Sequence, residues 1–343
     1  MTVRRVPADF RSIQEAVNQS APGDTIRVAG GIYRESVTIG EEKARLAIIG
    51  SGAGDTILEG DGTGVGFTIC GSSSVTIAGF TVTGFEVGIR VETSDNVIRN
   101  VTVTGSAASG IDVPQGGTRN LFFEIASNSN RVDGIVIRSS SNYVINSEFH
   151  NNTDDGIDFL GPSNVAIGNV ATGNNTGLST FGDNSVLIGN RFVGNQRALG
   201  MTGATGGLVY RNALSRSSEN SVTILTVTNA LLLGNEVSCS QGQGYRLSIS
   251  EGLRAVENQV ENNGTIGIVV GTERSVVDDN AVKDNAGAGI DAGSTATGNA
   301  VRRNQLKRNN PDIATRPPGD TNNVIDENRC KTSVPDGLCA CDD

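Results

Sequence analysis

The chain has 343 residues and a net charge of −10 at neutral pH. Aromatic residues make up only 4% of it, Trp is absent, and Gly occurs 45 times. This acidic balance, without basic or aromatic clusters, weighs against nucleic acid and anionic membranes as partners. No stretch has the length of a transmembrane helix, and the first five residues lack the apolar core of a secretion signal. We therefore expect an extracellular or cell-surface protein if a signal has been removed, and a cytoplasmic one otherwise.

The first predicted element is a short helix over residues 11–20. Ser12 and Glu15 have the Ser-x-x-Glu spacing of a capping box, and an apolar stripe runs through the same segment. A solenoid needs a cover at each open end. We predict that this helix plugs the first coil and that residues 1–50 form an N-terminal cap with that coil.

A repeat of about 22 residues follows and predicts the architecture. Each copy is a small residue followed by a short run in which apolar residues alternate, which is the pattern of a β-strand. We predict a single all-β domain, 1–343, folded as a right-handed parallel β-helix of about 12 coils, with three short strands in each coil over 51–328. The clearest runs begin at Gly66, Gly88, Gly110, Gly134, Gly156, Gly177, Gly267 and Gly289.

Asparagine recurs in two columns of the same repeat. Stacked Asn side chains can pass amide hydrogen bonds from coil to coil, and Asn tolerates the left-handed backbone of a sharp corner. We therefore predict structural asparagine ladders. The first column contains Asn100, Asn146, Asn169, Asn190, Asn212, Asn235, Asn258, Asn280, Asn304 and Asn328, and the second contains Asn151, Asn174, Asn195, Asn263, Asn285 and Asn309.

The chain has five cysteines, of which two fall in the predicted coils and three in the C-terminal segment. Cys70 and Cys239 fall within coils, where we expect buried thiols. Cys330 lies in the C-terminal segment 329–343, which we interpret as an irregular cap together with Pro317-Pro318-Gly319. A disulfide from Cys330 to Cys339 or Cys341 would stabilise this cap in an oxidising compartment.

Charged residues gather in the coils between residues 88 and 160. The middle position of each Gly-Ile-x-Val run is predicted to face outward, because side chains alternate along a strand. This outward strip is the expected floor of a groove. The charged residues on it or beside it are Arg90, Glu92, Asp112, Asp133, Arg138, Asp154, Asp155 and Asp158, with the only histidine, His150, on the preceding corner.

Repeat spacing converts these positions into approximate distances. Asp112 and Asp158 are two coils apart, so their backbones should lie about 9.6 Å from each other, near the upper end of the ~6.5–9.5 Å expected for the acid and base of an inverting glycosidase. Asp133 and Asp155 are one coil apart, about 4.8 Å, where two carboxylates raise a pKa or attract a calcium ion.

Three kinds of function fit this strip. Hydrolysis would use Asp112 and Asp158 as the acid–base pair. Lyase or C5-epimerase chemistry on a uronate would need Arg90 and Arg138 as carboxylate clamps and a base such as His150, Tyr143 or an unprotonated arginine.

Binding without catalysis is the third kind of function. It would give an adhesion or assembly protein, and the apolar outward positions Val136 and Val269 would suit the seam of a homotrimer. Purely structural roles also stay open for these residues. An Asp beside Gly is often a turn residue, and Arg90 with Asp112 could be a surface ion pair.

The chain resembles the pectin-lyase-like right-handed β-helix superfamily. The similarity rests on the Gly-Ile-x-Val and Val-Ile-x-x-Asn runs, on the opening segment 9–17 and on Gly23-Asp24-Thr25-Ile26-Arg27-Val28. The resemblance implies a polysaccharide or oligosaccharide partner, and it covers lyases, hydrolases, uronate epimerases and phage tailspikes. Fold and chemistry are separable in such a superfamily, so the activity depends on the site.

Motifs of individual subfamilies match only in part. Residues 152–158, Asn-Thr-Asp-Asp-Gly-Ile-Asp, are similar to the Asn-Thr-Asp-Gly-Ile-Asp stretch of polygalacturonases, which implies a catalytic role for Asp154. Asp155 is an insertion in that motif, and no Gly-His-Gly or Arg-Ile-Lys follows. The Asp-Pro-His-Glu signature of alginate C5-epimerases and the Arg-x-Pro-x-x-Arg element of pectate lyases are absent, although Asp158 stands where the epimerase Asp would fall. We therefore expect a carbohydrate-active enzyme without assigning a subfamily.

Overall fold

The structure is a computed structural model that describes residues 2–316 and 322–340. The chain divides into two compact units, Met1–Asn175 and Thr176–Asp343. Both units are built from parallel strands, and one short helix, α1 (Ile13–Gln19), is the only α-helix of the described residues. The all-β parallel solenoid is confirmed, whereas the assignment of the whole chain to one domain stays a prediction.

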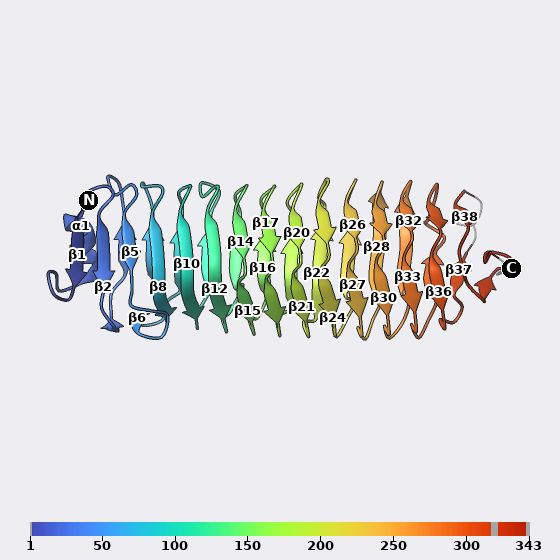
Figure 1. Ribbon diagram of the computed structural model, residues 1–343, viewed down its shortest axis with the longest axis horizontal. Helices are drawn as coiled ribbons and strands as arrows, with labels where there is room; N and C mark the ends of the chain where they lie inside the picture. Colours follow the sequence, from blue (N-terminus) through green and yellow to red (C-terminus); the bar gives the residue numbers. More distant parts are fainter. Residues whose placement is uncertain (1, 317–321, 341–343) are drawn as a thin grey trace. The chain divides into compact units, whose positions relative to one another are not determined.

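Unit 1 consists of two sheets, here called A and B, between which the chain winds (Figure 1). Sheet A of unit 1 contains β1 (Val3–Val6), β2 (Thr25–Val28), β3 (Gly31–Tyr33), β5 (Ala47–Ile49), β6 (Thr56–Glu59), β8 (Thr76–Thr83), β10 (Val97–Thr104), β12 (Leu121–Asn128), β14 (Tyr143–Ile145), β15 (Glu148–His150), β17 (Val165–Ile167) and β18 (Val170–Thr172). Sheet B of unit 1 contains β4 (Val37–Ile39), β7 (Val65–Ile69), β9 (Val87–Val91), β11 (Ile111–Val113), β13 (Ile135–Ile137) and β16 (Asp155–Phe159).

Unit 2 has the same two kinds of sheet. Its sheet A contains β20 (Val186–Ile188), β21 (Arg191–Val193), β23 (Leu208–Tyr210), β24 (Ala213–Ser215), β26 (Leu231–Leu233), β27 (Glu236–Ser238), β29 (Arg254–Val256), β30 (Gln259–Glu261), β32 (Val276–Asp278), β33 (Ala281–Lys283), β35 (Ala300–Arg302), β36 (Gln305–Lys307) and β38 (Val324–Asp326). Its sheet B contains β19 (Thr176–Thr180), β22 (Arg197–Thr202), β25 (Val222–Leu225), β28 (Tyr245–Glu251), β31 (Ile268–Glu273), β34 (Ile290–Ala292), β37 (Ile313–Thr315) and β39 (Ser333–Val334).

Alternating apolar residues explain why these segments are strands. In sheet B of unit 1, Ile111, Ile135 and Ile157 lie in register on successive coils, and each is fully buried. Stacking of like side chains fills a narrow interior without large aromatic groups, so the low aromatic content of the chain fits the thin core.

The coil count differs from the prediction. The chain makes about 15 turns rather than about 12. The additional rungs include β4 and β39, whose sequences carry no Gly-Ile-x-Val run. A count based on that run alone therefore misses coils at both ends of the sequence.

Helix α1 caps the first coils as predicted, over a slightly shorter span than 11–20. The Ser12 hydroxyl accepts a hydrogen bond from the Glu15 backbone N–H (3.0 Å), which is the expected N-cap geometry. Glu35 extends the cap, because its carboxylate accepts the N–H groups of Ile13 and Gln14 at 2.8 and 2.9 Å. The buried side of the helix covers the interior that would otherwise be open at β1 and β2.

Asparagine ladders are present in both units. In unit 2, Asn190, Asn212, Asn235, Asn258, Asn280, Asn304 and Asn328 each bond to the next through a backbone N–H and a side-chain amide. The prediction was wrong for Asn100, Asn146 and Asn151, which are exposed corner residues with left-handed backbone. The ladder positions beside the last two belong to Ser147 and Asn152, so these columns were offset by one residue. A further ladder, Asn96–Asn120–Asn142–Asn164, was not predicted.

The predicted disulfide is confirmed, whereas the predicted burial of two cysteine thiols is wrong. Cys330 pairs with Cys339 in a disulfide. Cys239 is exposed and Cys70 is partly exposed, so neither is the buried thiol that was expected. Cys239 has left-handed backbone (φ 58°), which places it on a corner rather than in the core. Cys341 and Pro317-Pro318-Gly319 lie outside the described residues.

Across the described residues, no helix combines the length and apolarity needed to cross a bilayer.

Candidate active site

Four neighbouring strands of sheet B in unit 1 form the candidate site, and three of them carry a charged residue at the outward position. Asp112 on β11 lies opposite Val136 on β13, and Val136 lies opposite Asp158 on β16. Arg90 on β9 lies opposite Asp112 on its other side. The parallel register therefore places Asp112 and Asp158 on the same face, two strands apart.

Asp133, Asp155 and Asp158 form a cluster of carboxyl groups, here called the acid cluster. One carboxylate oxygen of each lies within 4.8 Å of those of the other two. Asp133 and Asp155 directly precede the glycines that open two successive sheet B runs, and the Asp155 backbone N–H donates to Asp133 Oδ1 at 3.2 Å. A corner carboxylate (Asp133), a carboxylate at the start of β16 (Asp155) and an outward carboxylate of the same strand (Asp158) thus converge. The sequence predicts instead a metal pair of Asp133 and Asp155 and a separate acid–base pair that includes Asp158.

Asp158 has a strongly raised pKa. Burial raises its pKa to about 8, and the charges of Asp133, Asp155 and Asp154 add to this rise, while Arg138 opposes it. Its Oδ1 is buried and has no hydrogen-bond partner among the described residues. A carboxyl group with this pKa is largely protonated at neutral pH, so Asp158 can serve as a proton donor.

Asp133 is more deeply buried but better supported by hydrogen bonds. Only 6% of its surface is exposed, and burial raises its pKa. Hydrogen bonds from the Asp155 N–H and from the Ser109 hydroxyl (3.2 Å to Oδ2) work in the opposite direction, because they stabilise the ionised form. Asp133 is therefore held in place by the fold, where its charge disfavours ionisation of Asp158.

Asp112 is engaged by two arginines. Arg90 Nε lies 3.3 Å from one carboxylate oxygen, and Arg138 Nη1 contacts the other. The Asp112 side chain is only 15% exposed, whereas those of Arg90 and Arg138 are 37% and 45% exposed. This trio has a net charge of +1 and presents guanidinium groups outward, while Asp112 positions them.

The remaining predicted residues lie at different places. Asp154 is exposed and accepts a hydrogen bond from the Asn175 side chain at 3.0 Å. Glu92 is exposed and lies close enough to Cys70 to raise the pKa of that thiol, after the larger effect of burial.

His150 and Tyr143 belong to sheet A rather than to sheet B. His150 ends β15, where its ring contacts the Thr172 hydroxyl and lies 3.4 Å from Glu148. Tyr143 begins β14 and is 41% exposed. The structure therefore does not bring either residue to the strands that carry the acid cluster.

Val136 departs from the expectation that every outward position is open to solvent. It is only 2% exposed. It lies between Asp112 and Asp158 on the adjacent strands, and the long Arg138 side chain reaches back to Asp112 across the same rung. A seam residue has to be exposed in the single chain, so this burial argues against Val136 as part of a trimer seam, while the homotrimer itself stays a prediction.

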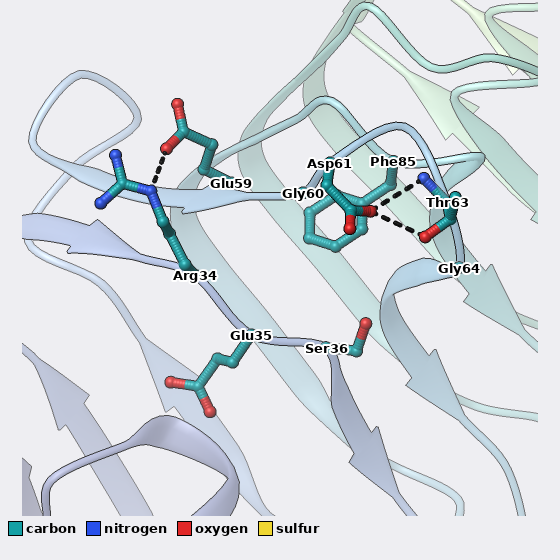
Figure 2. Close-up of a pocket in the computed structure, with 9 residues that line it drawn as sticks. All are labelled: Arg34, Glu35, Ser36, Glu59, Gly60, Asp61, Thr63, Gly64 and Phe85. Carbon is teal, nitrogen blue, oxygen red and sulfur yellow. Dashed lines mark hydrogen bonds and ion pairs between the residues drawn. The ribbon is translucent and has the colours of Figure 1, made fainter.

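A separate hollow of about 520 Å³ lies near the start of unit 1 (Figure 2). It is bounded by corners that precede β4, β7 and β9, the first strands of the sheet that carries the acid cluster. Arg34 pairs with Glu59 at 2.7 Å, and hydrogen bonds from Thr63 lower the pKa of Asp61. Figure 2 shows Glu35 pointing away from Asp61, toward the helix that it caps. Sequence reasoning missed this hollow because its residues come from corners of unequal length.

The raised pKa of Asp158 predicts a pH-dependent stability. In the unfolded chain this group titrates near 3.8, whereas in the folded protein it holds its proton up to about pH 8. Folding therefore takes up a proton between these values, and the free energy of unfolding should fall as pH rises from 5 to 8. Denaturant titrations at pH 5, 6.5 and 8 measure this slope. Asp158→Asn should flatten it, and an unchanged slope in that variant would contradict the assignment.

The fold and the register together define the class of protein. The chain is a right-handed parallel β-helix. The model of the family described as "Right handed beta helix region" matches residues 63–198 and 167–306, and the chain belongs to this family.

Solved structures with the same fold have different activities. The A-module of mannuronan C-5 epimerase AlgE6 from Azotobacter vinelandii is 17% identical, with a TM-score of 0.56 over 93% of this chain and 91% of that one. The Dettilon tailspike protein is 15% identical, with a TM-score of 0.58 over 91% and 68%. The catalytic domain of a GH87 α-1,3-glucanase in complex with nigerose is 13% identical, with a TM-score of 0.52 over 93% and 68%. At these identities the similarity shows the fold alone.

A curated relative matches a short segment only. The putative pectinesterase/pectinesterase inhibitor 38 of Arabidopsis thaliana is 35% identical over 89 residues. This segment spans 24% of this chain and 19% of the plant protein.

Proposed function

We propose that this protein is a carbohydrate-active enzyme that cleaves a polysaccharide on the outer face of sheet B in unit 1. The observation that carries the proposal is the acid cluster, in which one carboxyl group keeps its proton at neutral pH beside two others. Hydrolysis of a glycosidic bond requires an acid that protonates the leaving oxygen and a carboxylate that activates water or attacks the sugar. Relatives of the same fold that act on glycans, such as the glucanase and the epimerase, support the substrate class.

Within this proposal Asp158 is the general acid. Its proton would pass to the leaving oxygen, and the Asp133 or Asp155 carboxylate would activate water or attack the sugar. Asp112, the acid–base partner expected from the sequence, is held by Arg90 and Arg138. Its role is then to orient these arginines rather than to move protons.

A uronate-containing polymer is the substrate that the arginines favour. Arg90 and Arg138 remain about two-fifths exposed despite their contacts with Asp112. Guanidinium groups can still bind a sugar carboxylate through their outer N–H donors. Their position beside the acid cluster, rather than within it, suits a sugar residue next to the cleaved bond.

Hydrolysis is favoured over lyase or C5-epimerase chemistry by the location of the bases. Removal of a proton next to a carboxylate needs a base at the bound sugar ring. His150 and Tyr143 lie on sheet A strands, so the groups left beside the arginines are the carboxylates of the acid cluster. Those are better suited to acid–base work on a glycosidic oxygen.

Binding of calcium by the acid cluster is a second candidate that the same spacing supports. Three carboxylate oxygens within 4.8 Å of one another can share one divalent cation. A bound cation would relieve their repulsion and supply a Lewis acid for a uronate carboxylate. Calcium should then raise the melting temperature more at pH 8 than at pH 5, because it competes with the Asp158 proton. Asp133→Asn should remove the effect, whereas Asp154→Asn should keep it; an equal response at both pH values would contradict calcium binding.

The proposed function is tested by a screen of polysaccharides. Alginate, pectate, glycosaminoglycans and neutral glucans would be incubated with the protein, with and without calcium. New reducing ends are expected for hydrolysis, unsaturated products absorbing in the ultraviolet for a lyase, and altered uronate signals in NMR for an epimerase. Silence in all three readouts would overturn the enzymatic proposal and favour an adhesion or assembly protein.

A further inference from the structure

The chain contains only four lysines, at positions 43, 283, 307 and 331. Three of them recur every 24 residues near the end of unit 2. Lys283 on β33 lies opposite Lys307 on β36 in the parallel sheet. Arg329 forms a bridge with Gln305, and Lys331, two residues further along the chain, lines the same hollow as Lys283 and Lys307. We call Lys283, Lys307 and Lys331 the lysine ladder.

Such a ladder is unfavourable without a counter-charge. Parallel strands bring equivalent positions to about 4.8 Å, and like charges directly opposite each other destabilise a sheet. Lys283 is compensated by Glu261 at 2.7 Å. Among the ion pairs of residues 2–316 and 322–340 none involves Lys307 or Lys331, although Lys283 and Lys307 both attract the Asp284 carboxylate, which is paired with Arg308. In a chain with a net charge of −10 this is a local excess of positive charge.

The lysine ladder lines a hollow of about 560 Å³. Gln305 and Arg329 add further N–H donors, and Leu306 with Ala281 provides an apolar floor. Lys283, Lys307 and Lys331 are exposed, so their ammonium groups are accessible to a ligand. The Cys330–Cys339 disulfide fixes the segment that supplies Arg329 and Lys331. No residue of the acid cluster belongs to this hollow.

We propose that the lysine ladder binds a linear anionic polysaccharide, with acid groups on successive sugars meeting ammonium groups on successive coils. A repeating ligand suits a repeating row of point charges better than a single small anion does. Nucleic acid is the less favoured polyanion, because no aromatic side chain lines the hollow for base stacking and the protein as a whole is acidic. This site adds a binding function that does not depend on the chemistry of the acid cluster.

Binding is measured by calorimetry with the Asp158→Asn protein, so that turnover does not consume the ligand. The probes are a polyuronate, a sulfated glycosaminoglycan, a neutral dextran and an oligo-dT strand, each in low and in high salt. We expect binding to one or both anionic glycans, weakened at high salt. Lys307→Gln should weaken it about three-fold and the triple Lys→Gln variant about ten-fold or more, in line with the modest strength of exposed ion pairs.

Arg254→Gln is the matched control, because it removes an exposed positive charge from β29 of the same sheet. It should leave the affinity unchanged. Without glycan, Lys307→Gln should melt no lower than the parent, since it relieves repulsion. A triple variant that binds as tightly as the parent, no binding to either anionic glycan, or tighter binding of oligo-dT would each overturn the proposal. Loss of turnover in the Asp158→Asn protein with retained, lysine-dependent binding separates this site from the proposed catalytic one.

Discussion

Asp158→Asn is expected to reduce turnover of the substrate polysaccharide by about 10²- to 10⁴-fold, the range that positioned acid–base groups contribute. The amide has nearly the shape of the carboxylic acid but cannot supply a proton to the leaving oxygen. Substrate affinity should change little, so the loss should appear in kcat rather than in KM. Initial rates of reducing-end release measure both parameters.

The matched control for that variant is Asp154→Asn. Asp154 is exposed and neighbours the cluster, and its charge only adds to the rise in the pKa of Asp158. Its replacement should change kcat by less than about three-fold and shift the alkaline limb of the pH–rate profile downward, since removing a negative charge lowers the pKa of the acid. Activity retained in Asp158→Asn, or lost in Asp154→Asn, would reassign the acid to Asp154, as the polygalacturonase-like stretch implies.

Asn258→Ala should have the largest effect on stability. Asn258 is fully buried, and its Oδ1 accepts hydrogen bonds from the Asn235 backbone, the Asn235 side chain and the Tyr245 hydroxyl. Its Nδ2 donates to Leu232 O and to Asn280. Truncation leaves several buried groups without partners, and each costs about 1–3 kcal/mol, so a loss of roughly 3 kcal/mol or more is expected.

Urea denaturation followed by circular dichroism measures that loss. Asn262→Gly in the same coil is the control, because Asn262 is an exposed corner residue with a φ of 56°, a conformation that glycine adopts freely. This variant should unfold within about 0.5 kcal/mol of the parent. Equal destabilisation by the two changes would mean that the ladder contributes no more than an ordinary corner.

Much of the fold could be predicted because the repeat expresses physical periodicities directly. Inward isoleucines such as Ile111 and Ile135 define the strands, and their spacing defines the register. The ladder asparagines were harder to assign, since corner and ladder positions adjoin in sequence. Asn151 and Asn152 differ by one residue, yet one is exposed with left-handed backbone and the other is buried in the ladder.

The region of the candidate site could be predicted, but the arrangement of its side chains could not. Asp112 and Asp158 share the outward strip, and this was readable from their equivalent places in the repeat. The convergence of Asp158 with Asp133 and Asp155 could not be predicted, because it depends on the backbone conformation where each corner joins the following strand. Burial of Asp158, which sets its pKa, likewise depends on neighbouring side chains rather than on strand alternation.

The stacked register also governs how substitutions in this protein combine over evolution. Changes more than about 7–10 Å apart usually act independently, whereas groups in contact are coupled. Asp133 and Asp155, on adjacent coils, should therefore vary together. Asp112 and Asp158 lie two strands apart, but Arg138 contacts Asp112 and influences the Asp158 carboxyl group. Arg138 thus couples substitutions at Asp112 and Asp158, which would otherwise act independently at this separation. In a lineage that loses Arg138, the two aspartates should be able to change separately.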